Sequence, residues 1–408
     1  MTGKRYLRLS GLLLVVALVG AACGSSTEPD ASGTSAPPTS VTSASTGAAG
    51  LRETLATGLQ EHEYLAGIAV YAAVNTGLDS AVTKAAVGTL DENSVALSKA
   101  IGSIYGSDAE KAFLPLWRKH IDFFVAYTVG GVGGDKAAQA KAKRDLDGYR
   151  ADFGAFLGGA NPNLTKEAVA DALIPHVNST FDAIDDVVAK KPSAFMKLRE
   201  GGAKLRDLAG VLAGAIAPQF PDKFDGDAAS GGAQLRSTLS ALLQEHEYFA
   251  GIAVFNAVNF GLEHKQTAGA VKALGANSVA LADAIGSVYG PEARKAFLPL
   301  WRKHIDFFVA YTVGGVTGDE AMQAKAKSDL DGYRADFGAF LGGANPNLTK
   351  EAVAEALIPH VSSTFDAIDA VVAKDSSQFS KLREGASKLP AIGAVIADAI
   401  VKQFPEKF

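Results

Sequence analysis

The chain contains very little sulfur. Cysteine occurs once in 408 residues, at Cys23, and methionine three times, at Met1, Met196 and Met322. A single cysteine excludes an intrachain disulfide and a thiolate metal cluster. No methionine recurs at matching places in the two halves of the chain, which argues against a copper(I) store built on sulfur ligands. Any metal site in this chain therefore depends on imidazole and carboxylate side chains.

Several catalytic motifs are also missing. The sequence has no Gly-x-Ser-x-Gly, no His-Glu-x-x-His and no Cys-x-x-Cys-His. These absences argue against a nucleophile-elbow hydrolase, a zincin protease and a covalently attached haem. The segment GGVGGD at 130–135 is interpreted as a connection between helices and not as a phosphate-binding loop. The net charge of −5 disfavours nucleic acid as a partner.

The N-terminus has the layout of an export signal. Lys4, Arg5 and Arg8 precede a short apolar run, which ends in small residues before Cys23. This layout resembles a bacterial lipoprotein signal, although Gly20 stands where leucine is usual. The resemblance implies that residues 1–22 are a signal peptide and that Cys23 is lipidated. It also implies attachment to the cell membrane, on its extracytoplasmic face.

An internal repeat organises the rest of the sequence. Residues 51–224 align with residues 235–408 without a gap, and the segment KAFLPLWRKHIDFFVAYTVGGV occurs unchanged in both. Each copy is long enough to be a whole helical domain rather than one unit of a solenoid. Residues 23–50 are rich in Ser, Thr and Pro and are predicted to be a disordered tether. Residues 225–234 are predicted to be a linker.

The fold class predicted for each copy is all-α. Alanine and leucine are abundant, turn residues separate the apolar segments, and strand patterning is nearly absent. Long helices with short connections predict an up-down antiparallel bundle of about six helices per repeat. Pro115 and Pro175 lie inside two of these helices and are expected to kink them. The helices are expected near 51–76, 79–105, 108–130, 135–158, 165–190 and 194–217.

Three histidines per repeat are predicted to point into the bundle. The helical step of about 100° per residue places His62, His120 and His176 on apolar faces of three helices. Glu61 and Glu63 flank the first of them. Buried imidazoles and carboxylates cost free energy without partners, and one bound cation would satisfy them together. The candidate metal ligands are therefore His62, His120, His176, Glu61 and Glu63, with His246, His304, His360, Glu245 and Glu247 in the second repeat.

A second group of residues is predicted to orient these ligands. Asn93 faces inward from the second helix, and Tyr127 lies near His120 on the third. Asp122 either holds a ligand in place or forms a surface ion pair with Arg118 at i, i+4. The corresponding residues of the second repeat are Asn277, Tyr311 and Asp306. The seventh histidine, His264, replaces Ser80 and is predicted to lie at the surface.

The inward His and Glu side chains give the bundle a broad resemblance to ferritin-like metal proteins. That family uses Glu-x-x-His on two helices. Here Leu59, Trp117 and Leu173 stand three residues before the histidines, so no di-iron centre and no catalytic residue is carried over from the family. Imidazole together with carboxylate suits zinc, copper(II) or iron.

Three functional hypotheses follow from these observations. The first is a cell-surface metal-binding lipoprotein that buffers, scavenges or senses the ion. Binding is favoured over turnover because the predicted walls of the site are apolar. The second is a redox metalloenzyme, or a protein that binds haem non-covalently through the same histidines. The third is a structural or interaction protein of the cell envelope, with core histidines and no metal.

Overall fold

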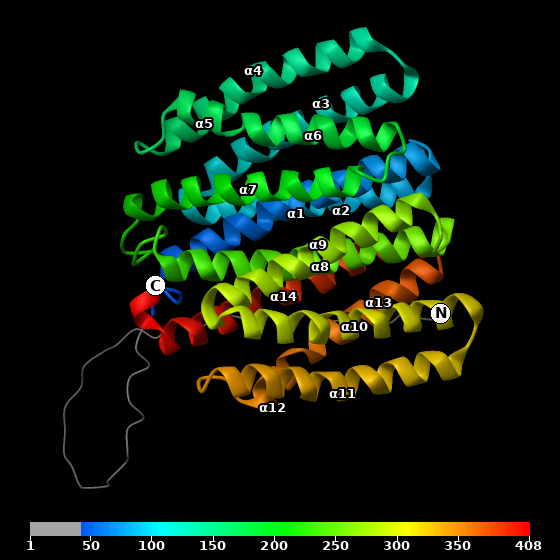
Figure 1. Cartoon of the computed structure of the whole chain (residues 1–408). Helices are drawn as coiled ribbons and strands as arrows, with labels where there is room; N and C mark the ends of the chain where they lie inside the picture. The colour runs from blue at the N-terminus through cyan, green and yellow to red at the C-terminus, as the bar shows by residue number, and fades with distance from the viewer. Residues whose placement is uncertain (1–41) are drawn as a thin grey trace, which may run out of the picture. The chain divides into compact units, whose positions relative to one another are not determined.

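The computed structural model describes residues 42–408 (Figure 1). Within this range the secondary structure is helical and contains no strand, which confirms the predicted all-α fold. Residues 42–408 belong to one compact unit. No helix in this range is both long enough and apolar enough to span a lipid bilayer. The predicted signal peptide, the lipidation at Cys23 and most of the predicted tether fall outside the described residues.

The two repeats contain the same helices in the same order. Matching helices have equal lengths, except that the last one has 23 residues in the first repeat and 26 in the second. The first repeat comprises α1 (Gly47–Thr76), α2 (Ala81–Tyr105), α3 (Ser107–Gly133), α4 (Lys136–Ala160), α5 (Lys166–Ala172), α6 (Ile174–Val188), α7 (Ala194–Ile216) and the 3₁₀ turn η1 (Ala217–Gln219). The second comprises α8 (Gly231–Phe260), α9 (Lys265–Tyr289), α10 (Pro291–Thr317), α11 (Glu320–Ala344), α12 (Lys350–Ala356), α13 (Ile358–Val372), α14 (Gln378–Gln403) and η2 (Pro405–Lys407).

Short polar side chains and glycines set the ends of the helices. The side chains of Thr46 and Ser80 accept hydrogen bonds from backbone N–H groups of the first turns of α1 and α2. Helix α2 is followed by Gly106, which has φ +92° and so adopts a conformation that residues with a Cβ rarely take. His264 caps α9, where its Nδ1 accepts from the Gln266 N–H at 3.3 Å. This histidine is half-buried and serves as a helix cap in the place of Ser80.

The fifth predicted helix is broken in two, so each repeat has seven α-helices instead of about six. Helix α5 ends at Ala172, Leu173 follows it, and Pro175 occupies the first turn of α6. Proline has no N–H and its ring collides with the preceding turn, so a helix starts at this residue more easily than it passes through it. Pro115, in contrast, lies within α3, which runs on beyond it.

The last part of the predicted tether, residues 42–50, is packed against the helices, and α1 already begins at Gly47. Ala44 is buried against the core of the second repeat, and the Thr42 hydroxyl donates to Asp398 at 2.6 Å. The Arg236 guanidinium donates to the Ala44 carbonyl at 3.1 Å. The equivalent contact is made with the repeats exchanged, since Arg52 of the first repeat donates to the carbonyl of Ala228, which precedes the second, at 2.9 Å. Each repeat thus binds the segment that precedes the first helix of the other.

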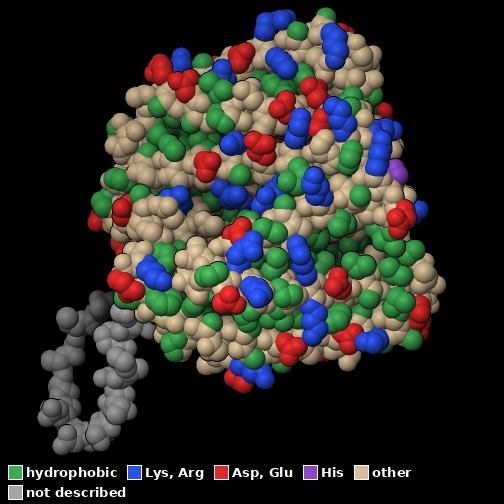
Figure 2. Space-filling model, in the orientation of Figure 1, with side chains coloured by type: hydrophobic (Ala, Val, Ile, Leu, Met, Phe, Trp, Pro, Cys, Tyr) green, Lys and Arg blue, Asp and Glu red, His purple; other side chains and the backbone are tan. Residues whose placement is uncertain are grey.

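Helices α1 and α8 lie against each other in the middle of the layered arrangement (Figure 1). Helix α1 also packs against α7 and α2 of its own repeat, and α8 packs against α14 and α9. As a result every residue from Leu59 to Leu65 is buried, whichever way it points. Tyr64 and Phe249 belong to a core cluster that crosses from one repeat to the other. The outer surface carries both charges, and Figure 2 shows Lys and Arg interspersed with Asp and Glu on the face drawn.

Candidate functional site

Two of the three predicted histidines meet directly. Nε2 of His62 on α1 lies 3.1 Å from Nε2 of His120 on α3. The indole of Trp117 packs edge-on against both imidazoles, with ring centroids 4.8 and 4.5 Å away. In the second repeat His246 and His304 are again separated by 3.1 Å between their Nε2 atoms. The four rings are almost fully buried, so only protein groups or a small ligand can reach their nitrogens.

The third histidine is paired with a buried carboxylate. Nδ1 of His176 on α6 lies 3.3 Å from Oε2 of Glu63. The Thr180 hydroxyl, one turn further along α6, donates to the same oxygen at 3.1 Å. Gly201 on α7 faces this carboxylate, and a Cβ at that position would collide with Glu63 Oε1. The second repeat has the same arrangement, with 3.5 Å between His360 Nδ1 and Glu247 Oε2.

Burial controls the charge of this cluster. It lowers the pKa of His120 to about 3 and that of His176 to about 4, and it lowers the pKa of His62 well below its usual range. The neighbouring imidazoles lower the pKa of His62 and His120 further. Burial raises the pKa of Glu63 to about 8, although the hydrogen bond from Thr180 opposes that shift. The three imidazoles are therefore neutral at pH 7, and each keeps one ring nitrogen available as an acceptor or metal ligand.

Glu61 does not join the histidines. Its carboxylate accepts a hydrogen bond from the hydroxyl of Tyr248, in the other repeat, at 2.7 Å. It also accepts from Asn93 Nδ2 at 2.7 Å and from the Arg383 guanidinium at 3.2 Å. The interface between α1 and α8 therefore uses both Glu61 and Asn93. Neither has an oxygen or nitrogen bonded to the imidazoles in the part of the chain that the structure describes.

Glu245 has the matching position and stronger partners. The hydroxyl of Tyr64 donates to it at 2.7 Å and Asn277 Nδ2 at 2.9 Å. Two guanidiniums also reach it, Arg199 at 2.5 Å and Arg206 at 3.0 Å. Pro390 stands in the second repeat at the place of Arg206, so Glu61 lacks the equivalent of this second arginine. Glu245 and Asn277 thus belong to a buried ionic network between the repeats and lie apart from the histidine cluster.

The remaining predicted orienting residues lie away from the cluster. The side chains of Asp122 and Asp306 are exposed. The predicted ion pair of Arg118 with Asp122 is wrong, because Arg118 makes two 2.7 Å hydrogen bonds to Asp91 on α2 instead. The Tyr127 hydroxyl donates to Asp185 at 2.9 Å, and Tyr311 donates to Asp369 at the same distance.

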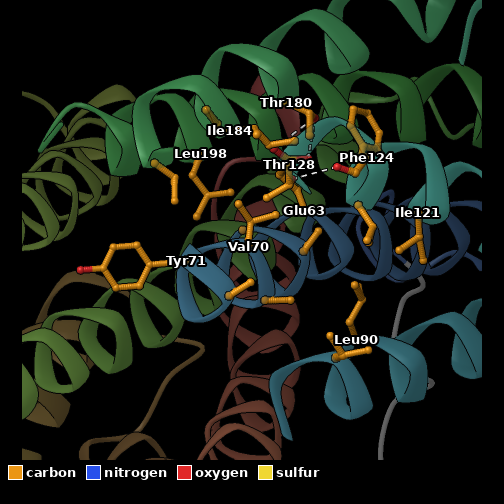
Figure 3. A pocket seen from close by; sticks show the side chains of 18 of the residues that line it. Glu63, Val70, Tyr71, Leu90, Ile121, Phe124, Thr128, Thr180, Ile184 and Leu198 are labelled. Atoms are coloured by element: carbon orange, nitrogen blue, oxygen red, sulfur yellow. Dashed lines mark hydrogen bonds between the residues drawn. The ribbon is translucent and has the colours of Figure 1, made fainter. Parts of the chain in front are cut away.

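A cavity of about 190 Å³ leads from the surface to Glu63 in the first repeat. Figure 3 shows Glu63 beside Thr180, with the apolar side chains of Val70, Ile121 and Leu198 among those around them. His62 and His176 also line this cavity. The corresponding cavity of the second repeat, beside Glu247, is only about 40 Å³.

Four buried polar atoms around the first cluster have no hydrogen-bond partner among the described residues. They are Nδ1 of His62, Nδ1 of His120, Nε1 of Trp117 and the Tyr149 hydroxyl. The second repeat leaves the same four groups unpaired, on His246, His304, Trp301 and Tyr333. Buried polar groups are usually paired, and the two repeats depart from this rule at the same places.

Sequence reasoning missed three residues that shape the site: Thr180, Tyr149 and Gly201. The i, i+4 spacing of His176 and Thr180 would have revealed the hydroxyl, since both lie on one face of a helix. Tyr149 on α4 lines a second cavity, of about 30 Å³, together with His120 and His176. Gly201 gave no such signal, because its role depends on the helix opposite.

In residues 42–408 no three side chains of His, Cys, Asp or Glu are already spaced to hold a metal ion together. The described arrangement is therefore a close pair of imidazoles with a histidine–glutamate pair next to it. No protein-family model, no curated protein and no solved structure matches this chain.

Proposed function

We propose that the chain is a metal-binding protein of the cell envelope, with one ion site in each repeat and a lipid anchor at Cys23. The observation that carries the proposal is the pair of buried Nε2 atoms of His62 and His120, 3.1 Å apart. Two nitrogens that bind one ion at about 2.0–2.1 Å, with an angle near 100° between the bonds, lie about 3.1 Å apart. The same spacing recurs at His246 and His304.

The electrostatics of the cluster suit a bound ion. The low pKa values keep the imidazoles of His120 and His176 neutral, which is the form that binds metal. Rotation of the His176 side chain, or rotation of Glu63 together with loss of the proton that its raised pKa keeps on it at pH 7, would supply a third ligand. Nitrogen with one carboxylate suits zinc, copper(II) or iron. A site that is complete only after such a rotation favours reversible uptake, as in buffering, scavenging or sensing.

Haem fits this pair poorly. Two axial histidines on opposite sides of one iron, each about 2.0 Å from it, would hold their nitrogens about 4 Å apart. The 3.1 Å separation between His62 and His120 is shorter than that. A redox enzyme using the same imidazoles is a second candidate, and oxygen or peroxide turnover by the iron- or copper-loaded protein would identify it. In a structural role without metal, the Nε2–H group of one of these two imidazoles would donate a hydrogen bond to Nε2 of the other.

Metal titration of chelator-treated protein separates these roles. We expect two equivalents of zinc or copper(II) per chain, one equivalent in His120→Gln, and none in His120→Gln/His304→Gln. The control is His264→Ser, which places a serine cap where the first repeat has Ser80 and leaves both sites intact. An ion at 100 times its dissociation constant would stabilise each site by about 2.7 kcal/mol. Uptake below half an equivalent per repeat, or unchanged uptake in the double variant, would refute the proposal.

The anchor needs a separate test because Cys23 lies outside the described residues. In a bacterial host, radioactive palmitate should label the full chain, and the label should be lost in Cys23→Ser. Labelling that persists in this variant would overturn the lipid anchor without affecting the metal proposal.

A further inference from the structure

The two repeats differ at the apolar cavity beside the glutamate. The cavity of the first repeat has about 190 Å³ and that of the second about 40 Å³, although most of the residues that line them are the same. One difference lies directly on the wall. Ala194 lines the cavity of the first repeat, and Gln378 occupies the same place in the second. Gln378 is only 3% exposed, so its longer side chain takes up space inside the protein.

The larger cavity is open to the outside. Leu78, Val87 and Val125 line it, and they are 44%, 48% and 47% exposed. The matching residues of the second repeat, Leu262, Val271 and Val309, are similarly exposed but do not line the smaller cavity. The cavity of the first repeat therefore extends from the glutamate to surface residues that the cavity of the second repeat does not reach.

The inner and outer parts of the cavity have different chemistry. Its walls are formed mainly by Val, Leu, Ile, Ala and Phe side chains, which favour an apolar molecule. Its inner end has the Glu63 carboxyl group and the Thr180 hydroxyl side by side, which offer hydrogen bonds to one polar group. A cavity of about 150 Å³ with apolar walls is known to accept benzene. A volume of about 190 Å³ fits an aromatic ring with a short substituent.

We infer that the first repeat binds a small, mainly apolar molecule with one hydroxyl group, an alkylphenol or a compound of that shape, and that Gln378 closes the equivalent site of the second repeat. The inference does not depend on metal. The ring lies among the apolar side chains, and the hydroxyl faces Glu63 and Thr180. Binding at this place brings the molecule next to His62 and His176, which line the same cavity.

Calorimetric titration of metal-free protein with 4-ethylphenol tests the inference. We expect one molecule per chain for the native protein and none for Ala194→Gln, which copies the second repeat into the first. Gln378→Ala should open the second cavity and raise the number to two. The variant with both changes should bind one molecule again, now in the second repeat.

Ethylbenzene, which lacks the hydroxyl, should bind about 2- to 10-fold more weakly, as expected for the loss of one hydrogen bond. Circular dichroism and thermal unfolding show whether Ala194→Gln is folded. Gln378→Ala provides an independent test, because it gains a site. No binding to the native protein, unchanged binding to Ala194→Gln, or no second molecule in Gln378→Ala would each overturn the inference. Since the protein is free of metal, these results are separate from the outcome of the metal titration.

Discussion

Replacing Glu245 with leucine should destabilise the protein more than any surface change, because this carboxylate joins the two repeats. Its side chain is 0% exposed and accepts four hydrogen bonds, from Tyr64, Asn277, Arg199 and Arg206. Leucine has a similar volume but accepts none of them. The two guanidiniums, each about one fifth exposed, would keep their charge without a counterion. Removal of one partner from a buried ion pair costs about 3–5 kcal/mol.

The assay is equilibrium unfolding in urea, with the free energy extrapolated to water. Two matched variants calibrate it. Glu61→Leu removes the equivalent carboxylate, which has one arginine at 3.2 Å, so its cost should be smaller than that of Glu245→Leu. Asp91→Asn weakens the exposed pair with Arg118 and should cost about 0–1 kcal/mol. A cost for Glu245→Leu no larger than that of Asp91→Asn would refute the assignment of this carboxylate as a stabilising contact between the repeats.

Three further predictions concern other parts of the molecule. In metal-free protein the folded-state pKa values of His120 and His176, about 3 and about 4, lie below the ordinary 6.5. Below pH 6.5 these two histidines therefore bind more protons in the unfolded chain than in the folded one. The free energy of unfolding should fall as the pH falls from 6.5 towards 4, by about 1.4 kcal/mol per group and pH unit. Urea unfolding should show this fall relative to variants with glutamine at these positions, and the same pH dependence in both would contradict the prediction. Gly201→Ala should displace the Glu63 carboxyl group and cost about 1–3 kcal/mol, measured by thermal unfolding; an unchanged melting temperature would mean that this side chain moves aside at no cost. Ala44→Asp should bury an unpaired charge and release the segment before α1, which proteolysis near residue 42 would detect; protection equal to that of the native protein would argue against this packing.

The helices and their inward histidines could be predicted because both depend on local information. Apolar periodicity identified the inward faces, and the inward direction of His62, His120 and His176 agrees with their burial. The break at Leu173 was predicted only as a kink, because a proline allows either a bend or a new start. Helix α5 packs against α4 and α6 packs against α7, and such contacts between helices are not visible in the periodicity of one helix.

Glu61 and Glu245 show where this reasoning fails. Periodicity tells which side of a helix is apolar, but it does not tell what covers the other side. Helix α1 lies between its own bundle and α8, so residues on opposite sides of it are buried for different reasons. The polar residues Gln60 and Tyr64 on the outer face carried the missing signal. They meet Gln244 and Glu245 in the other repeat, contacts that follow only once the two repeats are placed together.

The exchange of segments between the repeats has a consequence for how the chain holds together. The residues before α1 bind the second repeat, and the residues before α8 bind the first. A protease cut in the connection between Phe220 and Ser230 would therefore leave two fragments that still contact each other through the segments before α1 and α8. Two halves expressed as separate polypeptides should therefore reassemble. The covalent link between the halves thus fixes their stoichiometry at one to one and leaves each free to acquire its own substitutions, as Ala194 and Gln378 illustrate.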